Sequence, residues 1–217
     1  MVEEKILQIK EWLGSGSINI FGLPMSGKDT VGRRLAAVLG GKFLSSGDIL
    51  RQAAEQGTLT EKGELTPKDK FKEIVLPYFY DDSFAGRPLM LSAIGRWDEE
   101  MEETMTAAAK SGHPMKAVLL LNVSEADVWL RWEAAQALGD RTGRADDKTK
   151  EIFKTRLMEF RNKTAMTMMK YQKLGLLIHV DADEDRETVF EGVVEALWQR
   201  SQLTSSHTPE LWGLDQS

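Results

Sequence analysis

Residues 17–39 read SINIFGLPMSGKDTVGRRLAAVL, and this stretch decides the fold. A β-forming run over 17–21 leads into Gly22-Leu-Pro-Met-Ser-Gly-Lys-Asp-Thr30, and apolar residues at helical spacing follow. A G-x-x-x-x-G-K loop between a strand and a helix is typical of a phosphate-binding loop. Its glycines let backbone amides curl around an anion, and the helix N-terminus adds partial positive charge. The stretch therefore predicts a nucleotide-binding α/β protein, with a chance match in an unrelated loop as the alternative.

The side chains of this loop suggest how it would hold a nucleotide donor. Lys28 is expected to reach the outer phosphates, and Ser26 and Thr30 supply hydroxyls. The strict pattern has Ser or Thr directly after the lysine, whereas Asp29 intervenes here. The donor-binding residues predicted from this segment are Gly22, Pro24, Met25, Ser26, Gly27, Lys28, Asp29 and Thr30.

Outward from the loop, short β-rich runs alternate with helical patterns. The runs lie at 17–21, 42–44, 89–94, 117–123 and 176–181. Helices are expected over 2–13, from Ser124 onward with its hydroxyl as cap, over about 146–173, and over 186–200. This alternation predicts a central parallel sheet of five strands flanked by helices, a three-layer α/β fold.

Composition limits the classes of partner. Lys and Arg number 28 against 34 Asp and Glu, a net charge of −6, which disfavours a nucleic-acid-binding surface. There is no cysteine, and the three histidines are scattered, so thiolate chemistry and Cys- or His-based metal sites are excluded. No apolar run is long enough for a membrane span, and the polar N-terminus does not resemble a targeting signal. We therefore expect a cytoplasmic protein with no membrane partner.

Several motifs in order resemble the adenylate kinase family, in its short-lid form. Thr30 stands two places after the lysine, as in that family, and Ser46-Gly-Asp-Ile-Leu-Arg51 is similar to its Ser/Thr-Gly-Asp-x-Leu-Arg segment. Segments 63–67, 144–157 and 160–175 also resemble family motifs, so that the resemblance covers about residues 17–197. It implies a P-loop kinase domain (17–200). The N-terminal helix (1–16), expected from its helical spacing, and a flexible tail (201–217), expected from its lack of periodicity, lie outside the resemblance. Within the kinase domain the resemblance implies a small helical insert (46–75) that binds a nucleoside monophosphate and a short lid (134–146).

The resemblance also implies roles for particular residues. Phosphoryl transfer gathers several phosphates and needs fixed cations, for which arginine is well suited. The residues implied to act on the transferred group are Lys28, Arg96, Arg144 and Arg156. Those implied to bind the acceptor are Ser46, Arg51, Arg96 and Glu100, and Arg131 and Arg141 are implied to join the ATP-binding set. For each arginine alone, a solvated or salt-bridged surface position is the alternative.

Three departures from the family pattern concern the donor site. Met25 replaces a loop glycine and needs a compatible backbone angle. Asp29 replaces another glycine and would repel the donor phosphates unless a cation intervenes, and Ser92 stands where the family has the aspartate that orients magnesium waters. One hypothesis is that Asp29 supplies the missing carboxylate. The alternative is that phosphates, Thr30 and water hold Mg²⁺ without it.

A fourth departure concerns base recognition. Glu100 stands where adenylate kinases have a glutamine that reads adenine, and an ionised glutamate only accepts hydrogen bonds. It could equally be one more acidic residue on a solvated helix. Trp97 could stack on a base, but packing is the simpler interpretation.

Together these features predict a monomeric kinase that uses Mg²⁺ and transfers the γ-phosphoryl group of ATP to a nucleoside monophosphate, with AMP the first choice. Another P-loop small-molecule kinase, for a pyrimidine or guanosine monophosphate or of the sugar or shikimate type, is one alternative. A nucleotide-binding regulatory module with weak catalysis is the other.

Overall fold

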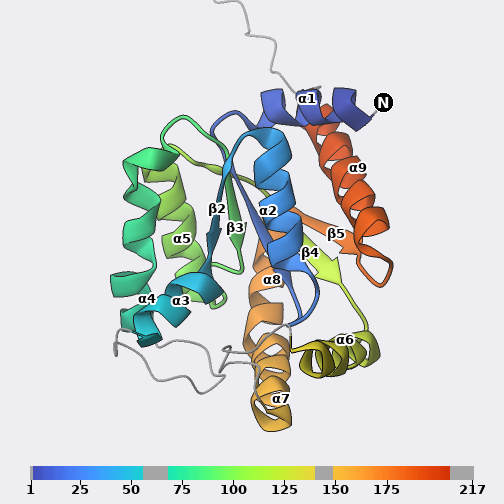
Figure 1. Ribbon diagram of the computed structural model, residues 1–217. Helices are drawn as coiled ribbons and strands as arrows, with labels where there is room; N and C mark the ends of the chain where they lie inside the picture. Colours follow the sequence, from blue (N-terminus) through green and yellow to red (C-terminus); the bar gives the residue numbers. More distant parts are fainter. Residues whose placement is uncertain (1, 56–67, 140–148, 206–217) are drawn as a thin grey trace, which may run out of the picture.

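A parallel five-stranded sheet forms the centre of the protein. The computed structural model describes residues 2–55, 68–139 and 149–205. The strands are β1 (Ser17–Gly22), β2 (Lys42–Ser45), β3 (Leu89–Ser92), β4 (Met115–Asn122) and β5 (Leu177–Asp181). They are ordered β2-β3-β1-β4-β5 and every pair is parallel, so the fold class expected from the alternating pattern is confirmed (Figure 1).

Helices cover both faces of the sheet (Figure 1). On one face, α1 (Val2–Leu13), α2 (Lys28–Leu39) and α9 (Arg186–Ser205) pack on β1 and β4 through a core that includes Leu35 and Val193. On the other, α5 (Asp98–Lys110) and α8 (Ala165–Lys173) pack through Met101, Met168 and Tyr171. The sheet is thus buried on both faces, which explains why its strands are nearly continuous apolar runs.

The remaining helices surround the carboxyl edge and one side of the sheet. They are α3 (Ser46–Glu55), α4 (Lys68–Ile74), the 3₁₀ turns Leu76–Tyr80 and Asp82–Phe84, α6 (Glu125–Leu138) and α7 (Lys150–Glu159). As expected, Ser124 caps α6, its hydroxyl accepting from the Asp127 amide at 3.0 Å. Most of the predicted lid and the centre of the predicted insert lie outside the described residues, so those domain limits remain predictions.

Two helix boundaries expected from the sequence are wrong. The helix expected over 146–173 begins at Lys150, where Thr149 accepts from the Ile152 amide, and a π-helical turn over Phe160–Thr164 separates α7 from α8. Helix α9 continues to Ser205, so the tail does not begin at 201. The stretch Ser-Gln-Leu-Thr-Ser contains no glycine or proline to end the helix, and Ser201 is buried.

Parallel strands bring three polar segments to one edge. The carboxyl ends of β1, β2 and β3 are neighbours, with Ser92 paired to Ile20 on one side and to Ser45 on the other. The phosphate loop follows β1, Ser46 follows β2, and Arg96 lies four residues after β3. This is the edge at which α/β sheets bind ligands.

Candidate active site

The loop between β1 and α2 has the backbone shape that anion binding requires. Gly27 has φ +87° and Met25 has φ +68°, so the loop curls back just before α2 begins at Lys28. A Cβ atom on Gly22 would lie 2.5 Å from Ser26 Oγ, which leaves room only for glycine. Within the described chain, Ser26 Oγ is buried and has no hydrogen-bond partner, which suits a hydroxyl that faces a ligand.

Met25 does adopt the left-handed conformation that its position in the loop demands. Its side chain packs on a cluster that includes Trp132 of α6 and Phe153 of α7, two rings stacked with centroids 5.5 Å apart. Arg131 donates to the carbonyls of Ala182 at 2.8 Å and Met25 at 3.5 Å. Arg131 thus ties the loop to the end of β5, and its contact with ATP remains a prediction.

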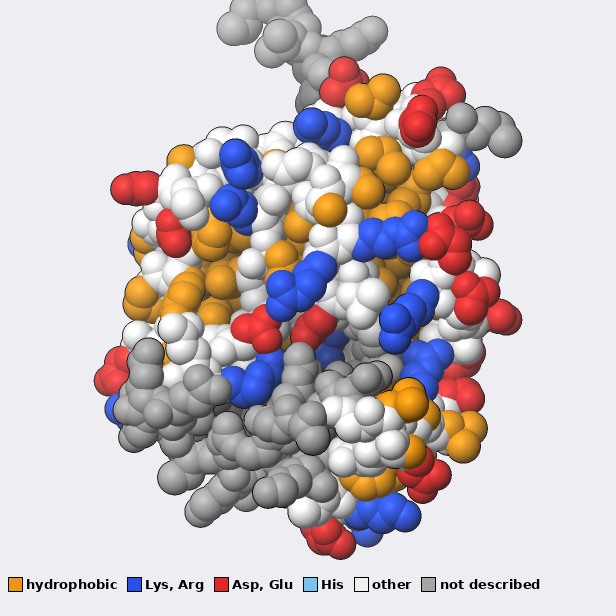
Figure 2. All heavy atoms as spheres, viewed as in Figure 1, with side chains coloured by type: hydrophobic (Ala, Val, Ile, Leu, Met, Phe, Trp, Pro, Cys, Tyr) orange, Lys and Arg blue, Asp and Glu red, His pale blue; other side chains and the backbone are white. Residues whose placement is uncertain are grey.

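A hollow of about 500 Å³ opens beside this loop, and we call it the phosphate hollow. Its lining residues are Met25, Gly27, Lys28, Asp29, Thr30, Ser45, Ser46, Gly47, Arg51, Ser92, Arg96 and Arg156. On the face seen in Figure 2, basic and acidic side chains are interspersed rather than gathered in one basic patch. Four of the lining side chains are cationic, namely Lys28, Arg51, Arg96 and Arg156. Positive charge is therefore concentrated in the hollow of a protein whose net charge is −6.

Three of the four predicted acceptor residues, Ser46, Arg51 and Arg96, line the phosphate hollow, and Glu100 does not. Arg96 donates from its guanidinium to Ser46 Oγ at 3.2 Å and to the Ala93 carbonyl at 3.2 Å. Arg51, on α3, pairs with Asp48 one turn earlier in the same helix. Ser46, Arg51 and Arg96 are therefore close enough to bind one anionic group together.

Asp29 and Ser92, the two departures in the donor site, are in direct contact. The Ser92 hydroxyl at the end of β3 donates to Asp29 Oδ1 at 2.5 Å. The Asp29 carboxylate comes from the first turn of α2. It therefore lies beside Ser92, the position at which the family has an aspartate. Asp29 and Thr30 together offer hard oxygen donors of the kind that Mg²⁺ prefers.

Glu100 is buried, contrary to the interpretation of the acidic run 98–103 as a wholly solvated face. It is 4% exposed, and Oε2 accepts from the amides of Arg96 at 3.0 Å and Trp97 at 3.4 Å. Burial raises the pKa of Glu100 to about 7, and these two hydrogen bonds and the Arg96 charge oppose the shift. Its carboxylate caps the N-terminus of α5, and its reading of a base remains a prediction.

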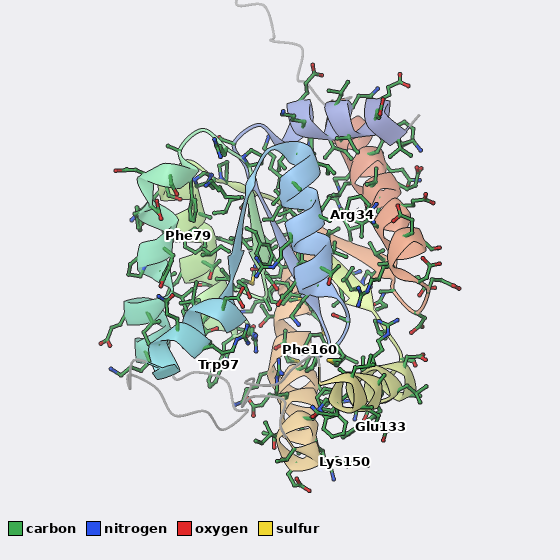
Figure 3. The ribbon with its side chains drawn as sticks, in the orientation of Figure 1. Arg34, Phe79, Trp97, Glu133, Lys150 and Phe160 are labelled. Atoms are coloured by element: carbon green, nitrogen blue, oxygen red, sulfur yellow. The ribbon has the colours of Figure 1, made fainter. Side chains whose placement is uncertain are left out.

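Trp97 is half-buried, and its indole Nε1 is buried without a hydrogen-bond partner among the described residues. The Lys163 ammonium lies 4.5 Å from the centroid of its ring. Trp97 and Phe160 both lie at the end of the sheet where the β1–α2 loop turns (Figure 3). Phe160 lines a second hollow of about 390 Å³ together with Lys28, Arg96 and Arg156.

The π-helical turn places polar groups in this second hollow. Glu159 and Thr164 line it, and Thr164 Oγ1 is buried without a hydrogen-bond partner among the described residues. π-helical turns occur frequently at functional sites. Since Lys28, Arg96 and Arg156 line both hollows, the two are parts of one site.

Two buried polar residues near the site were not singled out from the sequence. Asn19, fully buried in β1, donates to the Ile94 carbonyl at 2.7 Å, and Thr167 of α8 donates to the Arg96 carbonyl at 2.9 Å. Asn19 could have been identified from the sequence, because it is a polar residue in a strand that is buried on both faces. Thr167 carries no comparable signal in its amphipathic helix.

Arg141 and Arg144 lie outside the described residues, so their place in the site remains a prediction. Within 2–55, 68–139 and 149–205, no group of three or more His, Cys, Asp or Glu could hold a metal ion. None of the helices in those ranges is both long and apolar enough to cross a membrane.

Comparisons with known proteins agree with the geometry of this site. Residues 21–154 match the AAA domain family. An adenylate kinase of Thermus thermophilus is 30% identical over 190 residues, covering 83% of this chain and 96% of the relative. An adenylate kinase of Bacteroides fragilis is 27% identical over the same length, covering 83% of this chain and 97% of the relative.

Among solved structures, a gluconokinase from Sinorhizobium meliloti 1021 has a similar fold. The TM-score is 0.56 at 19% sequence identity, with 89% of this chain and 97% of the gluconokinase covered. At this identity the likeness concerns the fold, and it agrees with the P-loop α/β architecture.

Proposed function

The chain belongs to the adenylate kinase family, and from that premise we propose that it transfers the γ-phosphoryl group of ATP to AMP, giving two molecules of ADP. As a member of that family it is an ATP-dependent phosphotransferase acting on small molecules. The proposal also includes that the protein acts as a cytoplasmic monomer.

One observation carries the proposal: a donor wall and an acceptor wall face the same hollow. The donor wall consists of the loop amides, the N-terminus of α2 and Lys28. The acceptor wall consists of Ser46, Arg51 and Arg96. A hydroxyl and two guanidinium groups suit a phosphate monoester, because arginine binds phosphate oxygens in pairs.

The chemistry needs charge stabilisation more than proton transfer. The acceptor oxygen of a nucleoside monophosphate is already ionised, so no general base is required of the protein. Lys28 and the loop amides would hold the donor phosphates. Arg96 and Arg156, which line both hollows, would offset the charge on the group in transfer. Arg144 is proposed to join them from the lid.

We propose that the donor binds as its Mg²⁺ complex. Thr30 and Asp29 would hold the ion directly or through water, beside the phosphates that Lys28 contacts. When bound there, the ion would supply positive charge that offsets the charge of the donor phosphates. The same cation would make Asp29 compatible with a polyanion, because without it the carboxylate repels the donor.

The proposal is tested by a coupled assay with ATP, Mg²⁺ and each of AMP, GMP, CMP and UMP. AMP is expected to give ADP at the highest kcat/KM. Turnover of another monophosphate in preference to AMP would correct the acceptor, and turnover of none would overturn the proposal. Lys28→Met should lower kcat/KM at least about 100-fold with the fold retained, and Lys110→Met, exposed at the end of α5, is the matched control.

A second candidate is a kinase whose acceptor is a sugar or polyol hydroxyl. The observation that favours it is the Asp29 carboxylate in the phosphate hollow, because a hydroxyl acceptor, unlike a phosphate, has a proton to lose. Gluconate and shikimate in the same assay separate the two candidates. A regulatory module would bind ATP, as measured by calorimetry, and would phosphorylate none of these acceptors.

A further inference from the structure

Four part-buried hydrogen bonds hold the backbone and the side chain of Arg96. Its amide donates to Glu100 Oε2 at 3.0 Å, and its carbonyl accepts from Thr167 at 2.9 Å. Its guanidinium donates to the Ala93 carbonyl and to Ser46 Oγ, both at 3.2 Å. Backbone and side chain are therefore fixed from three helices and from the turn that follows β3.

The turn that carries Arg96 is itself strained and held from inside the sheet. Ala93 has φ +51°, a left-handed conformation that is unfavourable for a residue with a Cβ atom. The buried Asn19 side chain donates to the Ile94 carbonyl at 2.7 Å. Strained backbone at a ligand site persists where its surroundings impose it.

Among the residues that hold Arg96, Glu100 is the one whose burial costs the most free energy, because it carries an ionisable carboxyl group. A carboxyl group that is 4% exposed is stable only if its hydrogen bonds offset the loss of water. Oε2 is occupied by the Arg96 and Trp97 amides. Glu100 also does not line the phosphate hollow, whereas Arg96 does. The carboxylate thus contacts the backbone of Arg96 and Trp97 rather than the phosphate hollow.

We propose that Glu100 is a positioning residue for Arg96, which it fixes toward the transferred phosphoryl group, and that it does not read the acceptor base. The kinetic consequence of this inference rests on the proposed phosphotransfer. The contact between Glu100 and the Arg96 amide rests on the structure alone. Removing the carboxylate leaves two buried amides without an acceptor and frees the turn, so that Arg96 loses its alignment.

The test is a kinetic double-mutant cycle between Glu100→Ala and Arg96→Ala. In the wild-type background Glu100→Ala is expected to lower kcat about 100-fold, as a small misplacement of a catalytic group does. KM for the acceptor should change much less. In the Arg96→Ala background the same substitution should change kcat less than about 3-fold, because the residue it acts through is gone. Equal losses in both backgrounds would overturn the proposal.

Conservative variants separate positioning from base recognition. Glu100→Gln retains an oxygen that accepts from the amides and should stay within about 3-fold of the wild-type kcat. Its ranking of AMP, GMP, CMP and UMP should be unchanged. A change of KM confined to one base would overturn the proposal and favour base reading. Glu102→Gln, exposed on the same helix, controls for the change of charge.

A measurement that needs no enzymatic turnover tests this inference independently of the proposed reaction. Hydrogen exchange at the Arg96 and Trp97 amides should be faster in Glu100→Ala and in the shortened Glu100→Asp than in wild type, and unchanged in Glu102→Gln. If Glu100→Ala fails to fold, Glu100→Asp takes its place in the cycle. Wild-type protein that phosphorylates no monophosphate would overturn the proposed function. Unchanged exchange in the Glu100 variants would overturn the positioning role.

Discussion

Ser92 Oγ donates a 2.5 Å hydrogen bond to Asp29 Oδ1, and this contact joins the end of β3 to the first turn of α2. Each residue is a departure from the adenylate kinase pattern, and the two departures are adjacent in space. The family pattern has an aspartate at the position of Ser92, the last residue of β3, and here the Asp29 carboxylate of the neighbouring helix contacts that position.

The first prediction concerns the metal dependence of donor binding. Asp29→Ala should raise the Mg²⁺ concentration needed for half-maximal ATP binding by about 10-fold, since one anionic oxygen ligand is lost. ATP binding in the absence of Mg²⁺ should strengthen, because a repulsive charge is removed. Isothermal titration calorimetry across a Mg²⁺ series measures both. An unchanged Mg²⁺ requirement would contradict the role of Asp29, and Glu102→Ala serves as control.

The second prediction follows from the closeness of the two side chains. Asp29→Gly should lose activity, and adding Ser92→Asp should restore a large part of it, because the new carboxylate starts from a position in contact with the old one. Ser92→Asp alone should be harmful, since it places two carboxylates together. The kcat/KM values of the four proteins form a complete cycle. A double variant no better than Asp29→Gly would count against equivalence of the two positions.

The third prediction concerns Arg131 and the phosphate loop. Arg131→Ala removes the donors to the Met25 and Ala182 carbonyls and should lower the free energy of unfolding by about 1–3 kcal/mol. The affinity for ATP should fall as well, because the left-handed conformation at Met25 loses a support. Urea denaturation and ATP titration give the two values. Arg87→Ala, remote from the loop, should change neither the free energy of unfolding nor the ATP affinity. If Arg131→Ala leaves the ATP affinity unaffected, Arg131 contributes to stability alone.

The fourth prediction is a pH dependence of stability that Glu100 contributes. Its pKa is raised from 4.5 to about 7 in the folded protein, so between these values the native state holds a proton that the unfolded chain has released. Stability from this group is complete below pH 4.5 and is lost as pH rises toward 7, by at most about 3 kcal/mol. Arg96 and Glu103 are the charges that act on it, in opposite directions.

The measurement compares wild type with Glu100→Gln in urea between pH 4.5 and 8. Subtracting the variant cancels the other titrating groups, and the difference should move in favour of the variant as pH rises. A difference that is constant with pH, or that moves the other way, would contradict the raised pKa. Glu102→Gln should show no such trend.

The sheet and the loop were predictable because their signals are local. The apolar runs gave all five strands to within a few residues, and the spacing of Gly22, Gly27 and Lys28 identified the loop. The hydroxyl of Ser124 marked the start of α6. In each case the residues that carry the signal are neighbours in the chain, so that their physical meaning does not depend on the tertiary fold.

The features that escaped prediction depend on contacts between distant segments. Glu100 stands in an acidic run that reads as solvated, and only the approach of the Arg96 turn makes it a buried cap. Asn19 hydrogen-bonds to the backbone of Ile94, 75 residues away. The π-helical turn at Phe160 leaves no mark in a pattern that fits an uninterrupted helix.

The contacts around Arg96 also have a consequence for folding. Asn19 of β1 supports its turn, and Ser46 and Thr167 hold it from segments 50 and 71 residues away along the chain. Contacts of such long range form late, after loops of that length have closed. A fragment that lacks β1, α3 or α8 lacks one of these contacts. Catalytic competence should therefore arise in the same cooperative step as the native fold, so that enzyme activity is a direct measure of the population of fully folded molecules.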